Sequence, residues 1–221
     1  MLSNTFILHH YDLSPYAEKV RLLLGMANAA WGSVLTPAMP PRPSVEPLAG
    51  GYRRIPIAQM GADLFCDSRL IAAELAQWTG LPHLSPQATP ESAAALVRRA
   101  EGDVFFAAAG AAPTHVLLGT VLRNFGLLGS LRFAFDRIHM VRSAASPPPQ
   151  GRAAMRMYQQ FQADLNGVLA QHPILSGDTP GYADVALYHV VWLNTQARRA
   201  PLTDDHPHLK RWFERIASLG H

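Results

Sequence analysis

The pattern of apolar residues changes near residue 80, and this change restricts the folds that the chain can adopt. Before that point, short apolar runs typical of strands alternate with helical patterns in the order strand, helix, strand, strand, strand, helix. After Gly80 only helical patterns follow. A sheet buries its apolar face against the helices that cover it, whereas a group of helices buries its apolar sides between the helices. The two kinds of region therefore form different layers. The sequence therefore predicts an α/β region followed by an all-α region.

The first region is predicted to contain a βαβ unit followed by a ββα unit. We expect strands at 6–9, 33–35, 55–60 and 63–66 and helices at 15–24 and 68–78. Five prolines between residues 36 and 47 predict an irregular exposed loop. In the second region we expect helices at about 91–112, 130–144, 152–171, 182–198 and 207–219, and a surface loop at 146–151. We divide the chain into a first domain at residues 1–80, a linker at 81–90 and a helical domain at 91–221.

Composition disfavours nucleic acid as a partner. The 221 residues are 48% hydrophobic, which is enough for one large domain or two small ones. The net charge of +3 is small, and the 19 basic residues, most of them arginine, are spread along the chain without interleaved aromatic residues. We therefore interpret the pairs Arg98–Arg99 and Arg198–Arg199 as solvated helix surfaces.

Several features bear on location and on metals. The single cysteine, Cys66, cannot form an internal disulfide, which suits a reducing compartment. The first ten residues lack the charged start and the long apolar stretch of a secretory signal. Residues 104–122 are uncharged, but Pro113 interrupts them, which favours a buried helix that breaks there over a membrane span. The ten histidines show no metal-ligand spacing with cysteine or carboxylates. We expect a cytoplasmic protein with no membrane contact and no metal.

The segment SPYAEKVR, residues 14–21, follows the first predicted strand and begins the first predicted helix. Ser14 suits the N-cap and Pro15 the first helical position, while Gly25 is expected to end the helix. Free backbone N–H groups and the helix dipole give such a helix start a positive potential. The segment therefore predicts a capped helix whose start can also bind an anion.

Four segments of the chain resemble the glutathione S-transferase family. They are HHYDLSPYAEKVRLLL at 9–24, GGYRRIPIAQM at 50–60, FCDSRLIAAEL at 65–75 and HPHLKRWFERIAS at 206–218. Because a serine precedes Pro-Tyr, the N-terminal motif is similar to that of bacterial-type, serine-containing members of the tau-like or omega-like group. The resemblance implies a thioredoxin-like βαβ-ββα domain followed by an all-helical C-terminal domain. It also implies glutathione as co-substrate and a homodimer.

The resemblance assigns roles at two predicted helix starts. It implies that Ser14 stabilises the thiolate of glutathione and that Asp67 and Ser68 bind the γ-glutamyl carboxylate. A glutathione thiol has an ordinary pKa of about 8.5, so the catalytic task is to lower it. A serine hydroxyl is far less acidic than a thiol and cannot act as the base, but it can donate a hydrogen bond to the sulfur. Simple N-capping by these residues is the alternative.

The resemblance also assigns residues before the third strand. It implies a cis peptide bond between Ile55 and Pro56, so that the backbone of Ile55 pairs with glutathione as a strand would. It implies that Arg54 reaches the glycyl carboxylate. The alternatives are an ordinary trans proline on an edge strand and an Arg54 or Arg53 side chain that faces solvent.

The second substrate is expected between the two domains, since domain interfaces are common ligand sites. Tyr11 and Phe106 are our candidates for its pocket, with ordinary core packing as the alternative. Cys66 is the last residue of a predicted strand and does not precede Pro15, so we expect it to pack as a small apolar residue. In the C-terminal half, Gly181 occupies the position at which members of this family carry the Ser or Thr of a capping box. Only Asp184 of that motif is retained.

Three functions fit this sequence. The first is a glutathione transferase that activates the thiolate at Ser14 for attack on an electrophilic, apolar small molecule. The second is a glutathione-dependent lyase, isomerase or dehalogenase on the same fold, and the third is a non-catalytic binding protein of this fold. The sequence does not identify the second substrate, because fold alone does not determine function.

Overall fold

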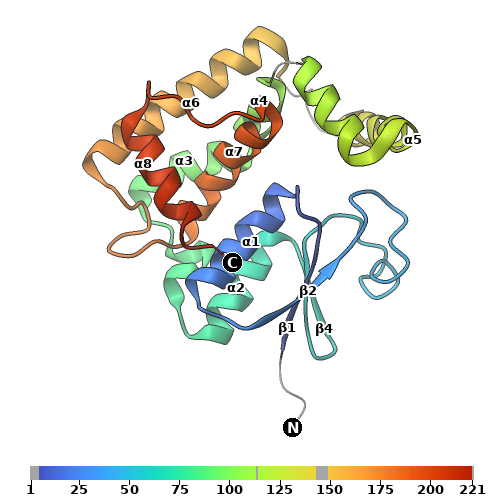
Figure 1. Ribbon diagram of the computed structural model, residues 1–221. Coiled ribbons are helices and arrows are strands. Elements are labelled where there is room, and N and C mark those ends of the chain that lie inside the picture. Colours follow the sequence, from blue (N-terminus) through green and yellow to red (C-terminus); the bar gives the residue numbers. More distant parts are fainter. Residues whose placement is uncertain (1–4, 113, 143–148, 221) are drawn as a thin grey trace.

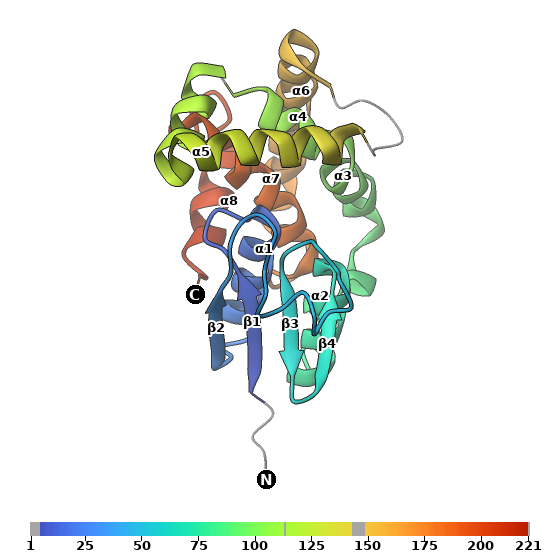
Figure 2. The ribbon, with the colours of Figure 1, turned by 90° about the vertical axis from the view of Figure 1, so that its right-hand side faces the viewer.

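A computed structural model describes residues 5–112, 114–142 and 149–220 (Figure 1). The N-terminal part contains a mixed four-stranded sheet in the order β2–β1–β3–β4. Its strands are β1 (Phe6–His10), β2 (Trp31–Leu35), β3 (Ile57–Met60) and β4 (Asp63–Cys66). Strand β1 is parallel to β2 and antiparallel to β3, and β3 is antiparallel to β4. Figure 2 shows the four strands side by side.

Two helices pack on one face of this sheet. They are α1 (Pro15–Met26) and α2 (Ser68–Thr79), and their apolar side chains bury Phe6 and Leu8 of β1 completely. Side chains alternate between the faces of a strand, so Ile57 lies on the opposite face. There it forms a small cluster with Val45 and Ile55, which the long loop between β2 and β3 carries. The predicted order βαβ-ββα is confirmed.

We had predicted that Gly25 ends the first helix, and this prediction is wrong. The helix α1 continues through Gly25 to Met26. A β-carbon at Gly25 would lie 2.5 Å from the carbonyl oxygen of Leu219 and 2.9 Å from that of Gly220. The glycine therefore allows the C-terminal segment to pass close to α1, a long-range contact that the local sequence does not reveal.

The remainder of the described chain is helical. Two short 3₁₀ turns, η1 (Pro82–Leu84) and η2 (Pro86–Ala88), connect the parts. The helices are α3 (Glu91–Glu101), α4 (Asp103–Gly110), α5 (Thr114–Arg142), α6 (Gly151–Gln171), α7 (Tyr182–Arg198) and α8 (Pro207–Ala217). Helix α7 is buried along most of its length and packs against both α1 and α3. It therefore joins the helical part to the sheet-containing part, and one cluster of buried apolar side chains includes residues of both.

The helices between residues 91 and 142 differ from the prediction. The expected helix at 91–112 is divided at Gly102, whose φ of −106° and ψ of −122° are not helical. The expected helix at 130–144 begins earlier, at Thr114, and is interrupted at Gly126, where φ is 65° and ψ is −177°. The predicted loop at 146–151 lies largely outside the described residues, as does Pro113.

The prediction that residues 104–122 are buried is correct only for their first part. Val104, Ala107 and Ala108 are buried, whereas Leu118 and Leu122 on α5 are exposed. By length and composition alone, the stretch Thr114–Asp136 is long and apolar enough to cross a membrane. Its non-helical residue at Gly126 prevents it from forming one straight helix.

The start of α7 shows how the incomplete capping box is satisfied. The Asp184 carboxylate accepts a hydrogen bond from the Gly181 N–H at 3.2 Å, and the Asp184 N–H donates to the Ser176 hydroxyl at 3.3 Å. Ser176 therefore supplies the hydroxyl that Gly181 lacks. A β-carbon at Gly181 would lie 2.3 Å from the carbonyl oxygen of His83, so the close passage of the linker requires glycine here.

Candidate functional site

Ser14 is the N-cap of α1, as predicted. Its hydroxyl oxygen accepts a hydrogen bond from the Ala17 N–H at 3.2 Å, and its own N–H donates to the Tyr11 carbonyl at 3.1 Å. Only 1% of the Ser14 surface is exposed, although the preceding residues Asp12 and Leu13 are exposed. The hydroxyl thus lies just below the surface at the start of a buried helix. In that setting a hydrogen bond to an anion is weakly screened by water.

The second helix start has an unusual backbone. Asp67 is the N-cap of α2, and its carboxylate accepts a hydrogen bond from the Arg69 N–H at 2.8 Å. Its φ of 82° lies in a region that residues other than glycine rarely adopt. Ser68 follows and is buried. Conformations of this kind cost about 1–3 kcal/mol and tend to occur at binding sites.

The two adjacent arginines in the segment before β3 lie in different surroundings. The bond between Ile55 and Pro56 is cis, as the resemblance implied, and both side chains are buried. Arg53 forms a hydrogen-bonded ion pair with Asp136 of α5. Arg54 is exposed and forms no ion pair with the part of the chain that the structure describes. Of the two, Arg54 therefore has the guanidinium available for a ligand carboxylate.

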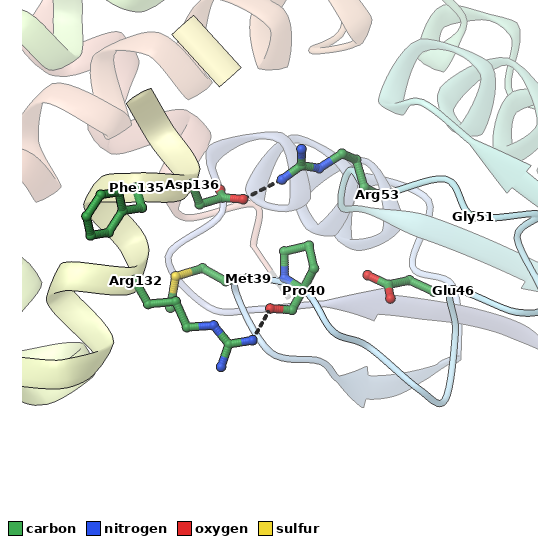
Figure 3. Close-up of a pocket in the computed structure, with 8 residues that line it drawn as sticks. All are labelled: Met39, Pro40, Glu46, Gly51, Arg53, Arg132, Phe135 and Asp136. Atoms are coloured by element: carbon green, nitrogen blue, oxygen red, sulfur yellow. Dashed lines mark hydrogen bonds and ion pairs between the residues drawn. The ribbon is translucent and has the colours of Figure 1, made fainter. Parts of the chain in front are cut away.

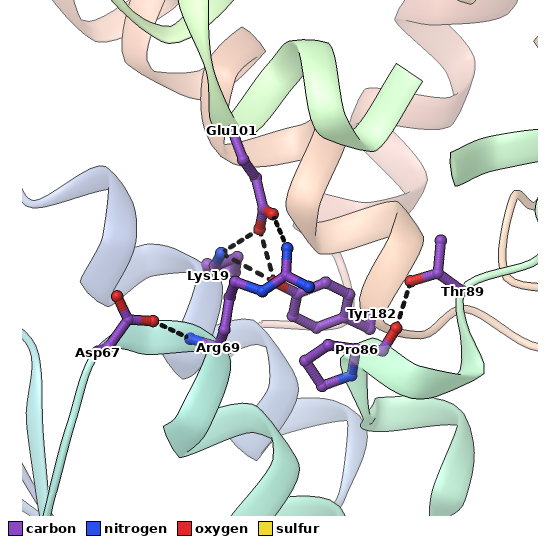
Figure 4. A network of polar contacts seen from close by, with 7 residues as sticks. All are labelled: Lys19, Asp67, Arg69, Pro86, Thr89, Glu101 and Tyr182. Carbon is purple, nitrogen blue, oxygen red and sulfur yellow. Dashed lines mark hydrogen bonds and ion pairs between the residues drawn. The ribbon is translucent and has the colours of Figure 1, made fainter. Parts of the chain in front are cut away.

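A network centred on a largely buried carboxylate joins both helix starts to the helical domain (Figure 4). The carboxylate of Glu101 on α3 accepts hydrogen bonds from Lys19 of α1 at 2.9 Å and from the Tyr182 hydroxyl of α7 at 2.5 Å. Its other oxygen accepts one from Arg69 of α2 at 2.5 Å. The Lys19 side chain is only 1% exposed. Four helices therefore meet at one carboxylate, and two of them, α1 and α2, are the helices capped by Ser14 and Asp67.

The charges of this network shift pKa values. Burial alone would raise the pKa of Glu101, but the Lys19 charge, the hydrogen bonds from Tyr182 and Lys19 and the Arg69 charge together outweigh burial and lower it to about 2. Burial, and next the Glu101 charge, raise the pKa of Tyr182 well above its ordinary value. Glu101 is therefore ionised at neutral pH, and the Tyr182 hydroxyl donates to it.

An aromatic cluster lies beside the network. The ring of Tyr16 contacts those of Phe105 and His189, with centroid distances of 4.7 Å and 5.3 Å. His189 is fully buried, and neither ring nitrogen makes a hydrogen bond of normal geometry. Its burial, and next the Lys19 charge, lower its pKa to about 3. His189 is therefore neutral under ordinary conditions and acts as an aromatic packing residue.

The two residues proposed for the second-substrate pocket lie in different surroundings. Phe106 on α4 is 38% exposed, and its ring meets that of Phe105 edge to face. Tyr11 is half-buried and packs on the cluster formed by Val45, Ile55 and Ile57. Neither residue lines the cavity of about 530 Å³ that separates the β2–β3 loop from α5 (Figure 3).

Cys66 is at the end of β4 and is half-buried against the same small apolar cluster. Its burial, and next the charge of Asp67, raise the pKa of its thiol. Among the described residues no group of three or more His, Cys, Asp or Glu side chains could hold a metal ion.

Sequence reasoning missed Lys19, Arg69, Glu101 and Tyr182, because the partners come from four distant parts of the chain. One signal was present. Glu18, Lys19 and Arg21 interrupt the apolar residues of α1, and charged side chains on a helix buried on nearly all sides need partners. Arg21 does pair with Glu18, at 2.5 Å, and it also donates to the Asp12 carbonyl at 3.0 Å. Arg21 therefore ties α1 to the loop before Ser14.

The structure combines a thioredoxin-like sheet, a helical bundle, and helix starts capped by Ser14 and Asp67. The comparisons with known proteins point to the class that has this architecture. The family model for the glutathione S-transferase N-terminal domain matches residues 8–83, and that for the C-terminal domain matches residues 131–219. A glutathione S-transferase-like protein from Pseudomonas syringae is 30% identical, with a TM-score of 0.68 over 99% of this chain and 68% of that chain. The chain belongs to the glutathione S-transferase family.

Other solved structures share the fold at lower identity. The tau class glutathione S-transferase from mango, Mangifera indica, is 15% identical, with a TM-score of 0.62 over 97% of this chain and 89% of that chain. The theta class enzyme from Xanthomonas axonopodis pv. citri, solved with glutathione bound, is 22% identical, with a TM-score of 0.60 over 96% of this chain and 92% of that chain. No curated protein sequence matches the chain.

Proposed function

We propose that the protein is a glutathione transferase in which Ser14 stabilises the glutathione thiolate for attack on an electrophilic, apolar small molecule. The observation that carries this proposal is the hydrogen bonding of Ser14. Its oxygen already accepts from the Ala17 N–H, so the hydroxyl hydrogen can be donated to a sulfur placed at the start of α1. The dipole of α1 adds a positive potential at the same point.

Glutathione would bind across both helix starts and the segment between them. The N-terminus of α2, with Asp67 and Ser68, would receive the γ-glutamyl carboxylate. The backbone of Ile55, beside Pro56, would pair with the peptide, and Arg54 would bind the glycyl carboxylate. Tyr11 and Phe106 would contact the second substrate.

The reaction then requires no base from the protein in its bond-forming step. The thiolate sulfur donates an electron pair to the electrophilic carbon and forms a C–S bond. In a substitution the leaving group departs with the electron pair of its bond to that carbon. Ser14 acts before this step, because a hydrogen bond to sulfur raises the fraction of thiolate at neutral pH.

A binding and product experiment tests this function. Isothermal titration calorimetry should show that glutathione binds, and mass spectrometry of reactions with a panel of electrophiles should find products that retain glutathione. Products free of glutathione would indicate the isomerase, lyase or dehalogenase alternative, and an isomerase would also return the glutathione unchanged. Binding without any turnover would indicate the binding protein.

We also infer a homodimer, as the family resemblance implied, and a cytoplasmic location, which the single cysteine suits. Exposed apolar side chains on the second half of α5 support association of two copies. Leu127 and Leu128 expose 72% and 82% of their surface, and Leu131 exposes 54%. Contiguous exposed apolar surface of this kind marks sites of association. Sedimentation equilibrium should give twice the mass of the chain.

A further inference from the structure

The cavity between the β2–β3 loop and α5 has apolar and charged side chains on both of its walls (Figure 3). Its volume is about 530 Å³, which is in the range of small-molecule sites. Met39 and Pro40 of the loop line it from one wall, and Arg132 and Phe135 of α5 from the other. Because the last two residues are three apart on a helix, their side chains lie on the same face.

The charged residues that line this cavity are two carboxylates, Glu46 and Asp136, and two arginines, Arg53 and Arg132. The carboxylate of Asp136 pairs with Arg53, and that of Glu46 lies 3.7 Å from Arg42. Arg132 pairs with no carboxylate of the described residues and donates one hydrogen bond, to the Pro40 carbonyl at 2.8 Å. A guanidinium has five N–H donors in a planar fork, and most of those of the exposed Arg132 have no acceptor among the described residues. The charges of the four ionisable lining residues sum to zero, but Arg53 pairs with Asp136, so Arg132 is the lining guanidinium available to an anion.

The apolar lining residues offer a surface for a flat ligand. The ring of Phe135 is 72% exposed, although it lines a cavity, and Met39 and Pro40 lie on the opposite wall. An aromatic ring in contact with Phe135 would bury apolar surface that is now in water. A ligand that matches the cavity thus joins an apolar ring to an anionic group.

The cavity adjoins the proposed glutathione site. Its lining residue Arg53 directly precedes Arg54, which we assign to the glycyl carboxylate. The loop that forms its wall carries Val45, which packs in the same apolar cluster as Tyr11 and Ile55. Tyr11 accepts the backbone hydrogen bond from Ser14. The loop that forms this wall therefore packs against the segments that would bind the sulfur and the peptide of glutathione.

We propose that this cavity binds the anionic end of the second substrate. The substrate class is an electrophilic aromatic or similarly flat apolar acid, whose carboxylate Arg132 binds and whose ring lies against Phe135. The inference rests on the proposed transferase function, since it identifies the ligand as the second substrate. Arg132 is thereby a specificity-determining residue, and a neutral electrophile of the same shape lacks its strongest contact.

Kinetics with a matched pair of electrophiles tests this proposal. The pair is a chloronitrobenzoate and the chloronitrobenzamide with the same ring substitution, in which the thiolate displaces chloride. We expect the wild-type protein to favour the acid over the amide in kcat/KM. In Arg132→Met the ratio of acid to amide should fall about tenfold or more, because a charge-assisted pair is lost. Arg132→Lys should give an intermediate ratio.

Arg123→Met is the matched control, because Arg123 is an exposed arginine on the same helix that does not line the cavity. It should leave the ratio of acid to amide as in the wild type. Equal ratios in wild type and Arg132→Met, or an equal fall in Arg123→Met, would overturn the assignment of Arg132.

A binding measurement separates this proposal from the proposed function. Calorimetric titration with a nitrobenzoate that has no leaving group needs no turnover, and its affinity should fall about tenfold or more in Arg132→Met but not in Arg123→Met. Such a fall supports the anion site even where neither chlorinated compound reacts, and the transferase function alone then fails. No nitrobenzoate binding, or binding independent of Arg132, overturns the anion site.

Discussion

At the scale of single residues, Glu101 determines part of the response of stability to acid. Its pKa is about 2 in the folded protein, against an ordinary value of 4.5. A carboxyl whose pKa is lowered by folding stabilises the protein above the ordinary pKa, and this contribution is lost as the pH falls toward the folded value. The two pKa values correspond to about 3 kcal/mol, which should disappear between about pH 5 and pH 2.

The variant Glu101→Gln tests this residue. At neutral pH it should lose about 3–5 kcal/mol of unfolding free energy, because Lys19 remains buried without its partner. Its stability should then fall less than that of the wild type between pH 5 and pH 2. Urea unfolding at a series of pH values measures both effects. Glu214→Gln, at an exposed position on α8, is the control, and an acid response of Glu101→Gln as steep as that of the wild type would contradict this account.

At the scale of elements, the start of α7 depends on the absence of a side chain at Gly181. In Gly181→Ala the new carbon would lie 2.3 Å from the His83 carbonyl oxygen, so the linker or the helix must move. We expect a loss of about 2–3 kcal/mol in unfolding free energy. Gly167→Ala is the matched control, since Gly167 lies within α6 with open space around it. It should gain about 0.5–1 kcal/mol, and a Gly181→Ala protein as stable as the wild type would be inconsistent with the close contact.

The elements also show what could be predicted from the sequence. The strands and helices of the first 80 residues follow clear apolar periods, and those predictions are confirmed to within a few residues. The first half of α5 was missed, because Leu118 and Leu122 are exposed and do not form a buried face with a helical period. The division at Gly102 was missed because the apolar pattern continues across it.

The candidate site could be predicted only in part, because some of its features are local in the sequence and others depend on how distant segments pack. The cap at Ser14 and the cap at Asp67 are local features, so the motifs reveal them. The contacts of Glu101 with Lys19 and Tyr182 join residues more than 80 positions apart, and only the packing of the two parts brings them together. The positive φ of Asp67 likewise depends on its surroundings, since aspartate does not require it.

At the scale of the whole molecule, the two parts share one apolar core and meet at α1. The helix packs against α2 on one side and against α7 on the other, and its start lies at the end of β1 (Figure 1). Glu101 connects this helix and α2 to the helical domain. The arrangement fixes the two helix starts relative to each other. In the proposed complex, one bound glutathione would place its sulfur at the first and its γ-glutamyl carboxylate at the second.

The ionisation of bound glutathione tests this account most directly. Ultraviolet absorbance of the thiolate, titrated against pH in the complex, should give a thiol pKa at least about one unit below the free value of about 8.5. In Ser14→Ala the thiol pKa should return most of the way to the free value, while Ser218→Ala, which alters an exposed hydroxyl on the surface, should match the wild type. An equally low thiol pKa in Ser14→Ala and in the wild type would contradict the role of Ser14.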